Sequence, residues 1–147
     1  MSKSLLMIHG MGCGGDVWGR MKPQFEAAGW ACEAPTLFPD LRTIKEPPEG
    51  IGRLGLQDYI DDMASRCKAI EKATGSKPAV IGHSMGGLVA QALAAEDRVS
   101  QAVFLTPAQT KECAKVGLSV AWTFGNVLVS GKRDKGHKVW KRGFIFG

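Results

Sequence analysis

Apolar and polar residues follow two alternating patterns along the chain. Four short apolar runs, closed by glycine, proline or polar residues, predict β-strands at residues 5–9, 31–37, 77–82 and 100–105. The segments between these runs have apolar positions at helical spacing and predict helices within residues 16–29, 56–75 and 85–96. Strands that alternate with helices predict an α/β fold, with a mainly parallel sheet and helices on both faces.

The longest predicted helix shows the pattern most clearly. Tyr59, Met63, Cys67 and Ile70 recur at intervals of three or four residues, which places them on one face, and Gly75 provides a stop. Residues 39–55 are rich in proline, glycine and charged residues, so we expect them to form a surface loop and not a linker between domains. A length of 147 residues predicts a single domain with one hydrophobic core.

The positive charge is concentrated at one end of the chain. The net charge is +5, and residues 132–147 contain six basic residues and one acidic residue, so the remainder is neutral. This tail has neither the alternation of basic and aromatic residues nor the recognition-helix motif that nucleic-acid-binding proteins show. Nucleic-acid binding is therefore not predicted. A hydrophobic share of 44% with 22% charged residues is typical of a globular protein.

Two apolar stretches bear on the location of the protein. The N-terminal stretch is too short for a signal peptide, and residues 116–131 fall short of the ~20 residues that a membrane-spanning helix needs. The four cysteines are scattered without a CxxC pair, so we predict neither a metal site nor a redox motif. We therefore expect a cytoplasmic protein with reduced thiols and no integral membrane segment.

A glycine motif follows the first predicted strand. Gly10, Gly12 and Gly15 have the spacing GxGxxG, and an acid that could bind a ribose, Glu33, follows at about the expected distance. A dinucleotide-binding domain is therefore one hypothesis. Because this spacing is common by chance and Pro23 interrupts the helix that should begin at the third glycine, a tight strand-to-helix turn explains the same residues.

A second glycine motif, GHSMG at residues 82–86, lies between a predicted strand and a predicted helix. In a nucleophile elbow, the serine stands on a strained turn, and the glycines let the flanking backbone segments pass close together. The helix that follows directs its N-terminal dipole at a developing oxyanion. We therefore predict that Ser84 is a nucleophile.

With these motifs in place, the chain resembles the α/β-hydrolase superfamily over nearly its whole length. Residues 9–18 (HGMGCGGDVW) are similar to the HG loop of that family, and residues 82–87 (GHSMGG) are similar to its nucleophile elbow. The resemblance implies that the backbone N–H groups of Met11 and Met85 form the oxyanion hole, with no cofactor or metal. It also implies a core at residues 1–110 and, at residues 111–147, the start of a cap with a basic tail, which favours a small apolar acyl substrate.

The catalytic base is harder to identify. The family places an acid and then a histidine after the serine. His9 belongs to the HG loop and is predicted to be structural, and the side chain of His83 should point away from the nucleophile. His137 has the right chain order but stands in a charged stretch, so it is the candidate base, with a solvated surface histidine as the alternative. The available acids are poorly placed: Glu96, Asp97 and Asp134.

The last predicted strand, at residues 100–105, is apolar toward both faces although it would lie at an edge of the sheet. We therefore expect an α/β-hydrolase fold that is incomplete at its C-terminus, with an exposed edge that can self-associate. The leading hypothesis is a serine hydrolase that cleaves an ester, lactone or related acyl compound through an acyl-enzyme on Ser84. A catalytically incomplete chain that binds an apolar ligand is the alternative, and acyl transfer or C–C cleavage would use the same elbow.

Overall fold

The computed structural model describes residues 3–41 and 50–109. Its strands are β1 (Lys3–Ile8), β2 (Trp30–Glu33), β3 (Ala79–His83) and β4 (Gln101–Leu105). Its α-helices are α1 (Lys22–Ala27), α2 (Leu56–Thr74) and α3 (Met85–Ala95). Short 3-10 helices are η1 (Gly15–Trp18), η2 (Pro39–Leu41) and η3 (Ile51–Arg53).

The chain divides into two compact units. The described part of the first unit comprises residues 3–39 and 55–109, and that of the second comprises residues 40–41 and 50–54. All the strands and α-helices named above belong to the first unit.

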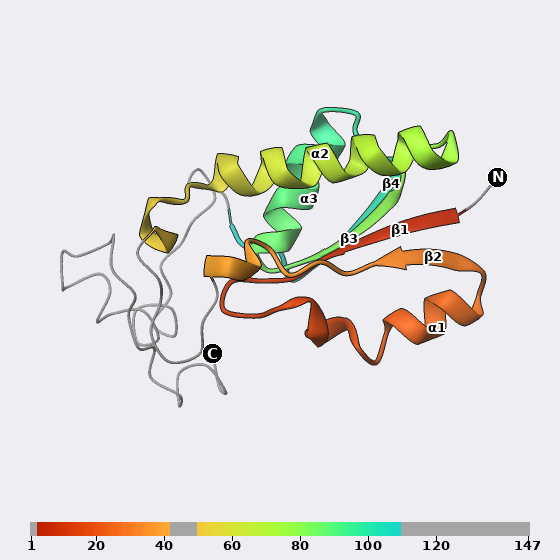
Figure 1. Cartoon of the computed structure of the whole chain (residues 1–147), viewed down its shortest axis with the longest axis horizontal. Helices are drawn as coiled ribbons and strands as arrows, with labels where there is room; N and C mark the ends of the chain where they lie inside the picture. Colours follow the sequence, from red (N-terminus) through yellow and green to blue (C-terminus); the bar gives the residue numbers. More distant parts are fainter. Residues whose placement is uncertain (1–2, 42–49, 110–147) are drawn as a thin grey trace. The chain divides into compact units, whose positions relative to one another are not determined.

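The four strands form one parallel sheet in the order β2-β1-β3-β4. Figure 1 shows α1 on one face of this sheet and α2 and α3 on the other. The prediction of a parallel α/β sheet covered on both faces is therefore confirmed. The carboxyl ends of β1 and β3 lie side by side, because Ile8 pairs with Gly82, and this pairing brings the two glycine motifs together.

The sheet contributes to a core on each of its faces, because successive side chains of a strand point to opposite sides. On the face of α1, Leu5 and Met7 pack with Trp18 of η1 and with β3. Leu6 and Ile8 alternate with them, point to the face of α2 and α3, and are fully buried.

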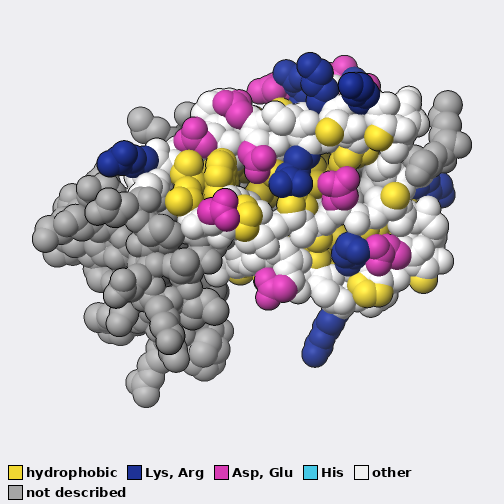
Figure 2. Space-filling model, in the orientation of Figure 1, with side chains coloured by type: hydrophobic (Ala, Val, Ile, Leu, Met, Phe, Trp, Pro, Cys, Tyr) yellow, Lys and Arg dark blue, Asp and Glu magenta, His cyan; other side chains and the backbone are white. Residues whose placement is uncertain are grey.

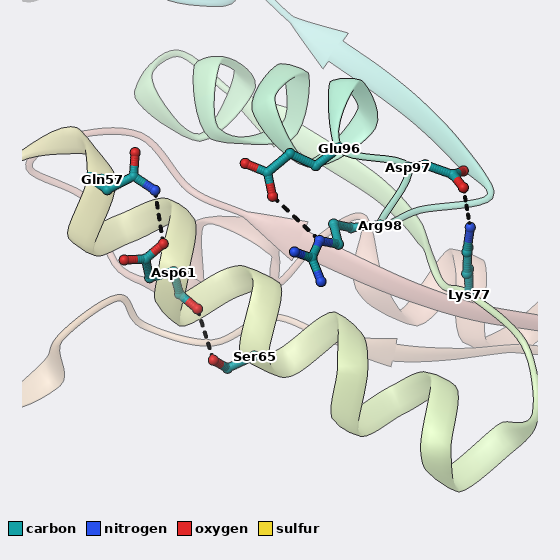
Figure 3. Close-up of polar contacts among 7 residues, drawn as sticks. All are labelled: Gln57, Asp61, Ser65, Lys77, Glu96, Asp97 and Arg98. Atoms are coloured by element: carbon teal, nitrogen blue, oxygen red, sulfur yellow. Dashed lines mark hydrogen bonds and ion pairs between the residues drawn. The ribbon is translucent and has the colours of Figure 1, made fainter.

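Helix α2 follows the predicted pattern. It buries the predicted face together with Ile60 and ends at Gly75, whose φ of 74° is left-handed and whose N–H bonds to the carbonyl of Glu71. Burial raises the pKa of the Cys67 thiol from its ordinary value of 9.0 to about 11. The solvated side of α2 carries local polar contacts, with Asp61 accepting from both Gln57 and Ser65 (Figure 3).

Strand β2 is shorter than the predicted strand at residues 31–37. The chain leaves the sheet after Glu33 because the next residues pack on the glycine loop that follows β1. A Cβ on Gly15 would collide with the carbonyl of Ala34, and the Gly15 N–H donates to the Thr36 hydroxyl at 3.0 Å. A contact between two loops therefore ends this strand.

The charged side chains of the described residues are interspersed by sign on the face seen in Figure 2. Two ion pairs close the turns near the end of α3: Lys77 with Asp97 at 2.7 Å, and Arg98 with Glu96 at 3.3 Å (Figure 3). Within the part of the chain that is described, no helix is long and apolar enough to cross a membrane.

Candidate active site: a serine on a strained turn

Ser84 stands at the turn between β3 and α3, as the elbow motif predicts. Its φ of 52° and ψ of −117° are unusual for a residue with a side chain. The hydroxyl does not cap α3, and the residue is only partly buried. A serine held in a strained backbone at a helix N-terminus is the arrangement that a nucleophile elbow requires.

The two glycines of the GHSMG motif are both needed for the turn to close. A Cβ on Gly82 would collide with the carbonyl of Gly86 and come within 2.8 Å of the Gly87 Cα. A Cβ on Gly86 would meet the carbonyl groups at the end of β1, with the His9 oxygen at 2.6 Å. Because all these atoms belong to the backbone, no side-chain rotation could relieve the contacts.

The last residue of β4 and the segment that follows it hold the Ser84 backbone in place, which the sequence did not predict. The Ser84 N–H donates to the carbonyl of Leu105 at 3.1 Å, and the Ser84 carbonyl accepts from the N–H of Ala108 at 2.9 Å. The same carbonyl also accepts from Gly87 and Leu88 in the first turn of α3. The unusual conformation is therefore fixed by bonds on both sides, as a strained residue needs in order to persist.

The loop after β1 lies against this turn. A Cβ on Gly10 would approach the Ser84 Cβ to 3.1 Å, and the Cys13 N–H bonds to the Gly10 carbonyl at 3.3 Å, which closes a tight turn. Met11 is the residue after Gly10 in this turn, and its side chain is 64% exposed. The structure thus places the loop that carries Met11 beside the turn that precedes Met85.

Met85 is the first residue of α3, and its side chain is buried. The first N–H groups of a helix have no acceptor within it. In α3, the N–H groups of Gly87 and Leu88 bond to the Ser84 carbonyl, and the Met85 N–H precedes them at the positive end of the helix dipole. The backbone of Met85 is therefore placed where a helix favours negative charge.

His9 is fully buried at the end of β1 and is locked by two hydrogen bonds. The Leu37 N–H donates to His9 Nε2 at 2.9 Å, so this nitrogen carries no proton, and Nδ1 donates to the Gly10 carbonyl at 2.8 Å. The ring thus ties the glycine loop to the chain beyond β2. This arrangement supports a structural role, as expected.

Of the other candidate groups, His83 lies at the turn itself, and the acids of the described residues lie away from it. The Nδ1 atom of His83 lies beside Gly10, 3.1 Å from the position of an added Cβ. Glu96 and Asp97 follow the last turn of α3, and a rise of about 1.5 Å per residue along the helix places them about 18 Å or more from Ser84. Lys77 lowers the pKa of the exposed Asp97 carboxyl through a hydrogen bond. The candidate base His137 lies outside the described residues, as do Asp134 and the predicted cap at residues 111–147.

The dinucleotide hypothesis finds no support in the loop geometry. Gly15 begins η1, a 3-10 helix of four residues, and α1 does not begin until Lys22. A pyrophosphate site of the Rossmann type needs a full helix whose N-terminus follows the third glycine. Glu33, the proposed ribose ligand, is exposed at the end of β2.

A family model described as the Alpha/beta hydrolase family matches residues 5–144. Comparison with curated proteins gave no match. One similar solved structure is BpoC from Mycobacterium tuberculosis H37Rv, a non-heme bromoperoxidase by name. It has a TM-score of 0.64 and 26% identity, over 94% of this chain and 47% of that chain.

Two further structures show the same fold. The methylesterase MES16 from Arabidopsis has a TM-score of 0.59 and 20% identity, over 74% of this chain and 44% of that chain. A pyrethroid hydrolase from Sphingobium faniae JZ-2 has a TM-score of 0.55 and 22% identity, over 73% of this chain and 40% of that chain. The chain therefore spans less than half the length of each of these three structures.

Proposed function

The chain belongs to the alpha/beta hydrolase family, and on that premise we propose that it acts as a serine hydrolase with Ser84 as its nucleophile. The observation that carries the proposal is the backbone of Ser84, with a φ of 52° between β3 and α3. This strained turn exposes a serine beside a helix N-terminus, which is the arrangement that covalent catalysis uses.

In the proposed reaction, the Ser84 hydroxyl attacks the carbonyl carbon of an ester, lactone or related acyl compound. A base takes the hydroxyl proton, and the tetrahedral oxyanion accepts hydrogen bonds from the backbone N–H groups of Met11 and Met85. The leaving alcohol receives the proton as the acyl-enzyme forms, and water then hydrolyses that intermediate. The close approach of Gly10 to Ser84 supports this assignment, because it places the loop of Met11 beside the turn that precedes Met85.

For the base we propose His137, on chain order alone. We also propose that residues 1–110 are a hydrolase core and that residues 111–147 begin a cap. The apolar character of residues 116–131 then favours a small apolar acyl substrate. The names of two structural relatives, a methylesterase and a pyrethroid hydrolase, agree with ester substrates.

Two measurements test this proposal. The first follows hydrolysis of p-nitrophenyl esters of increasing acyl length by the purified chain and by Ser84→Ala, His137→Ala and Ser65→Ala. Ser65 is an exposed serine of α2 and provides the matched control. We expect Ser84→Ala to lower turnover by about ten-thousandfold or more, and Ser65→Ala to leave it unchanged.

The second measurement is labelling by a fluorophosphonate, with the modified peptide located by mass spectrometry. We expect the label on Ser84. Turnover that survives Ser84→Ala would contradict the nucleophile assignment, and turnover that survives His137→Ala would contradict the assignment of the base. A folded chain that neither hydrolyses the esters nor takes the label would favour the alternative, a catalytically incomplete chain that binds an apolar ligand.

A further inference from the structure

The chain turns after β4 and passes the nucleophile turn a second time. We call residues 105–108 the β4 corner. The Leu105 carbonyl accepts from the Ser84 N–H at 3.1 Å, directly after the last residue pair of β3 and β4. Three residues later, the Ala108 N–H donates to the Ser84 carbonyl at 2.9 Å. The β4 corner therefore binds both polar backbone groups of the same serine.

The β4 corner keeps this shape against backbone strain. Thr106 has a φ of 40°, which is unfavourable for a β-branched residue, and the proline that follows it restricts its backbone further. A residue persists in such a conformation only where the surrounding contacts determine it. The two hydrogen bonds to Ser84 lie on either side of Thr106 and provide part of this restraint.

Pro107 provides another part, because it packs on Gly87 in the first turn of α3. A Cβ on Gly87 would lie 2.9 Å from the Pro107 Cβ and 3.0 Å from its Cα. The same Cβ would lie 3.1 Å from the Gly82 carbonyl oxygen on its other side. The space between the β4 corner and β3 therefore admits only a glycine, and this contact accounts for the last glycine of the GHSMGG sequence.

The Ser84 carbonyl belongs to the same peptide unit as the Met85 N–H. This unit is planar, and in its trans form the two groups point in opposite directions. The N–H groups of Gly87 and Leu88 also bond to this carbonyl, but they lie in the same helical turn and move with it. The bond from Ala108 comes from a separate segment, so it fixes the direction of the peptide unit relative to the sheet.

We propose that the Ala108 N–H is a positioning group for the oxyanion hole, because it holds the peptide unit that carries the Met85 N–H. The contact between Pro107 and Gly87 keeps Ala108 in this place. The inference rests on the proposed function, in which the Met85 N–H is an oxyanion donor. Such a donor must be held within about 0.5 Å of its productive position, and a hydrogen bond to the carbonyl of its own peptide strengthens it. Because the donor acts in the transition state, losing the Ala108 bond should lower kcat and leave KM nearly unchanged.

Removing the Ala108 N–H itself tests this role directly. Lactic acid in place of Ala108, introduced with a suppressor tRNA, replaces the N–H by an ester oxygen and keeps the methyl side chain. The matched control is lactic acid in place of Ala28, an exposed residue whose N–H bonds to the Gln24 carbonyl at the end of α1. We expect the first ester to lower kcat for a p-nitrophenyl ester by about tenfold to a hundredfold with KM within about twofold, and the second to change neither. An unchanged kcat in the first ester would overturn the proposal.

A second variant, Gly87→Ala, displaces Pro107 from α3 and has a readout that does not require catalysis. We expect hydrogen exchange of the Ala108 amide, followed by NMR, to be slow in the unmodified chain and about tenfold or more faster in Gly87→Ala. Gly55→Ala, where an added Cβ meets no atom closer than 3.7 Å, should keep the slow exchange. Equal exchange of the Ala108 amide in all three chains would overturn the proposal. A folded chain without Ser84-dependent turnover would instead contradict the proposed function, and the exchange rates would then decide alone whether Pro107 and Gly87 hold this bond.

Discussion

Replacing Ser84 by glycine should stabilise the protein relative to replacing it by alanine. Alanine keeps the Cβ atom that makes a φ of 52° unfavourable, whereas glycine adopts positive φ without this penalty. Neither variant retains the hydroxyl, so the comparison isolates the backbone strain at the nucleophile. Glycine normally destabilises a regular element relative to alanine, so this prediction reverses the usual sign.

The magnitude follows from two opposing contributions. A residue with a side chain in such a sparsely populated region costs about 1–3 kcal/mol. Glycine loses about 0.5–1 kcal/mol more conformational entropy on folding than alanine does. We therefore expect Ser84→Gly to be more stable than Ser84→Ala by about 1 kcal/mol.

Urea unfolding of both variants measures this difference, provided that their m-values agree. Ser65 supplies the control, because it is an exposed residue within α2. There, glycine should be less stable than alanine by about 1 kcal/mol. If Ser84→Gly proves less stable than Ser84→Ala by as much as in the Ser65 pair, then the Ser84 backbone is not strained.

Three further predictions concern the surroundings of the site. Gly86→Ala should destabilise the fold by about 3 kcal/mol or more, because its Cβ meets backbone atoms, whereas Gly12→Ala, with open space and a φ of 74°, should cost only about 1–2 kcal/mol. If urea unfolding shows the same loss of unfolding free energy for both variants, this expectation is wrong. His9→Phe should cost about 1–3 kcal/mol, because the buried Leu37 N–H loses its acceptor, and an unchanged denaturation midpoint would count against that bond. For Cys67, the folded pKa of about 11 exceeds the ordinary 9.0, so the unfolded chain loses its proton first. The contribution of Cys67 to the free energy of unfolding should therefore stay constant below pH 9 and decrease between pH 9 and 11. Urea unfolding curves measured across this range should show a steeper decrease for the unmodified chain than for Cys67→Ala.

Much of the fold and part of the site could be predicted without the structure. The apolar runs located all four strands, and the spacing of Tyr59, Met63, Cys67 and Ile70 located α2 and its buried face. The GHSMG motif located the turn with Ser84. These predictions held because each depends on interactions within a few residues, where steric limits and burial act on the local pattern.

Other features depended on contacts between distant segments. The end of β2 is set by Gly15 against Ala34, and nothing in the local pattern indicated that contact. The predicted role of His9 agrees with the structure, but its acceptor bond from Leu37 lies 28 residues away in the chain. Such contacts require knowledge of which loops meet at one end of the sheet.

The sequence by itself determined the order of strands and helices and the residue at the centre of the candidate site, since glycine requirements and helical periodicity are local properties. Only the tertiary structure decided how the Ser84 backbone is held, through Leu105 and Ala108, and that Pro107 packs against Gly87. Both depend on the register between β3 and β4, which is a pairing of segments some twenty residues apart. Register comes from the simultaneous burial of both sheet faces and the satisfaction of backbone hydrogen bonds, and neither is encoded within a single segment.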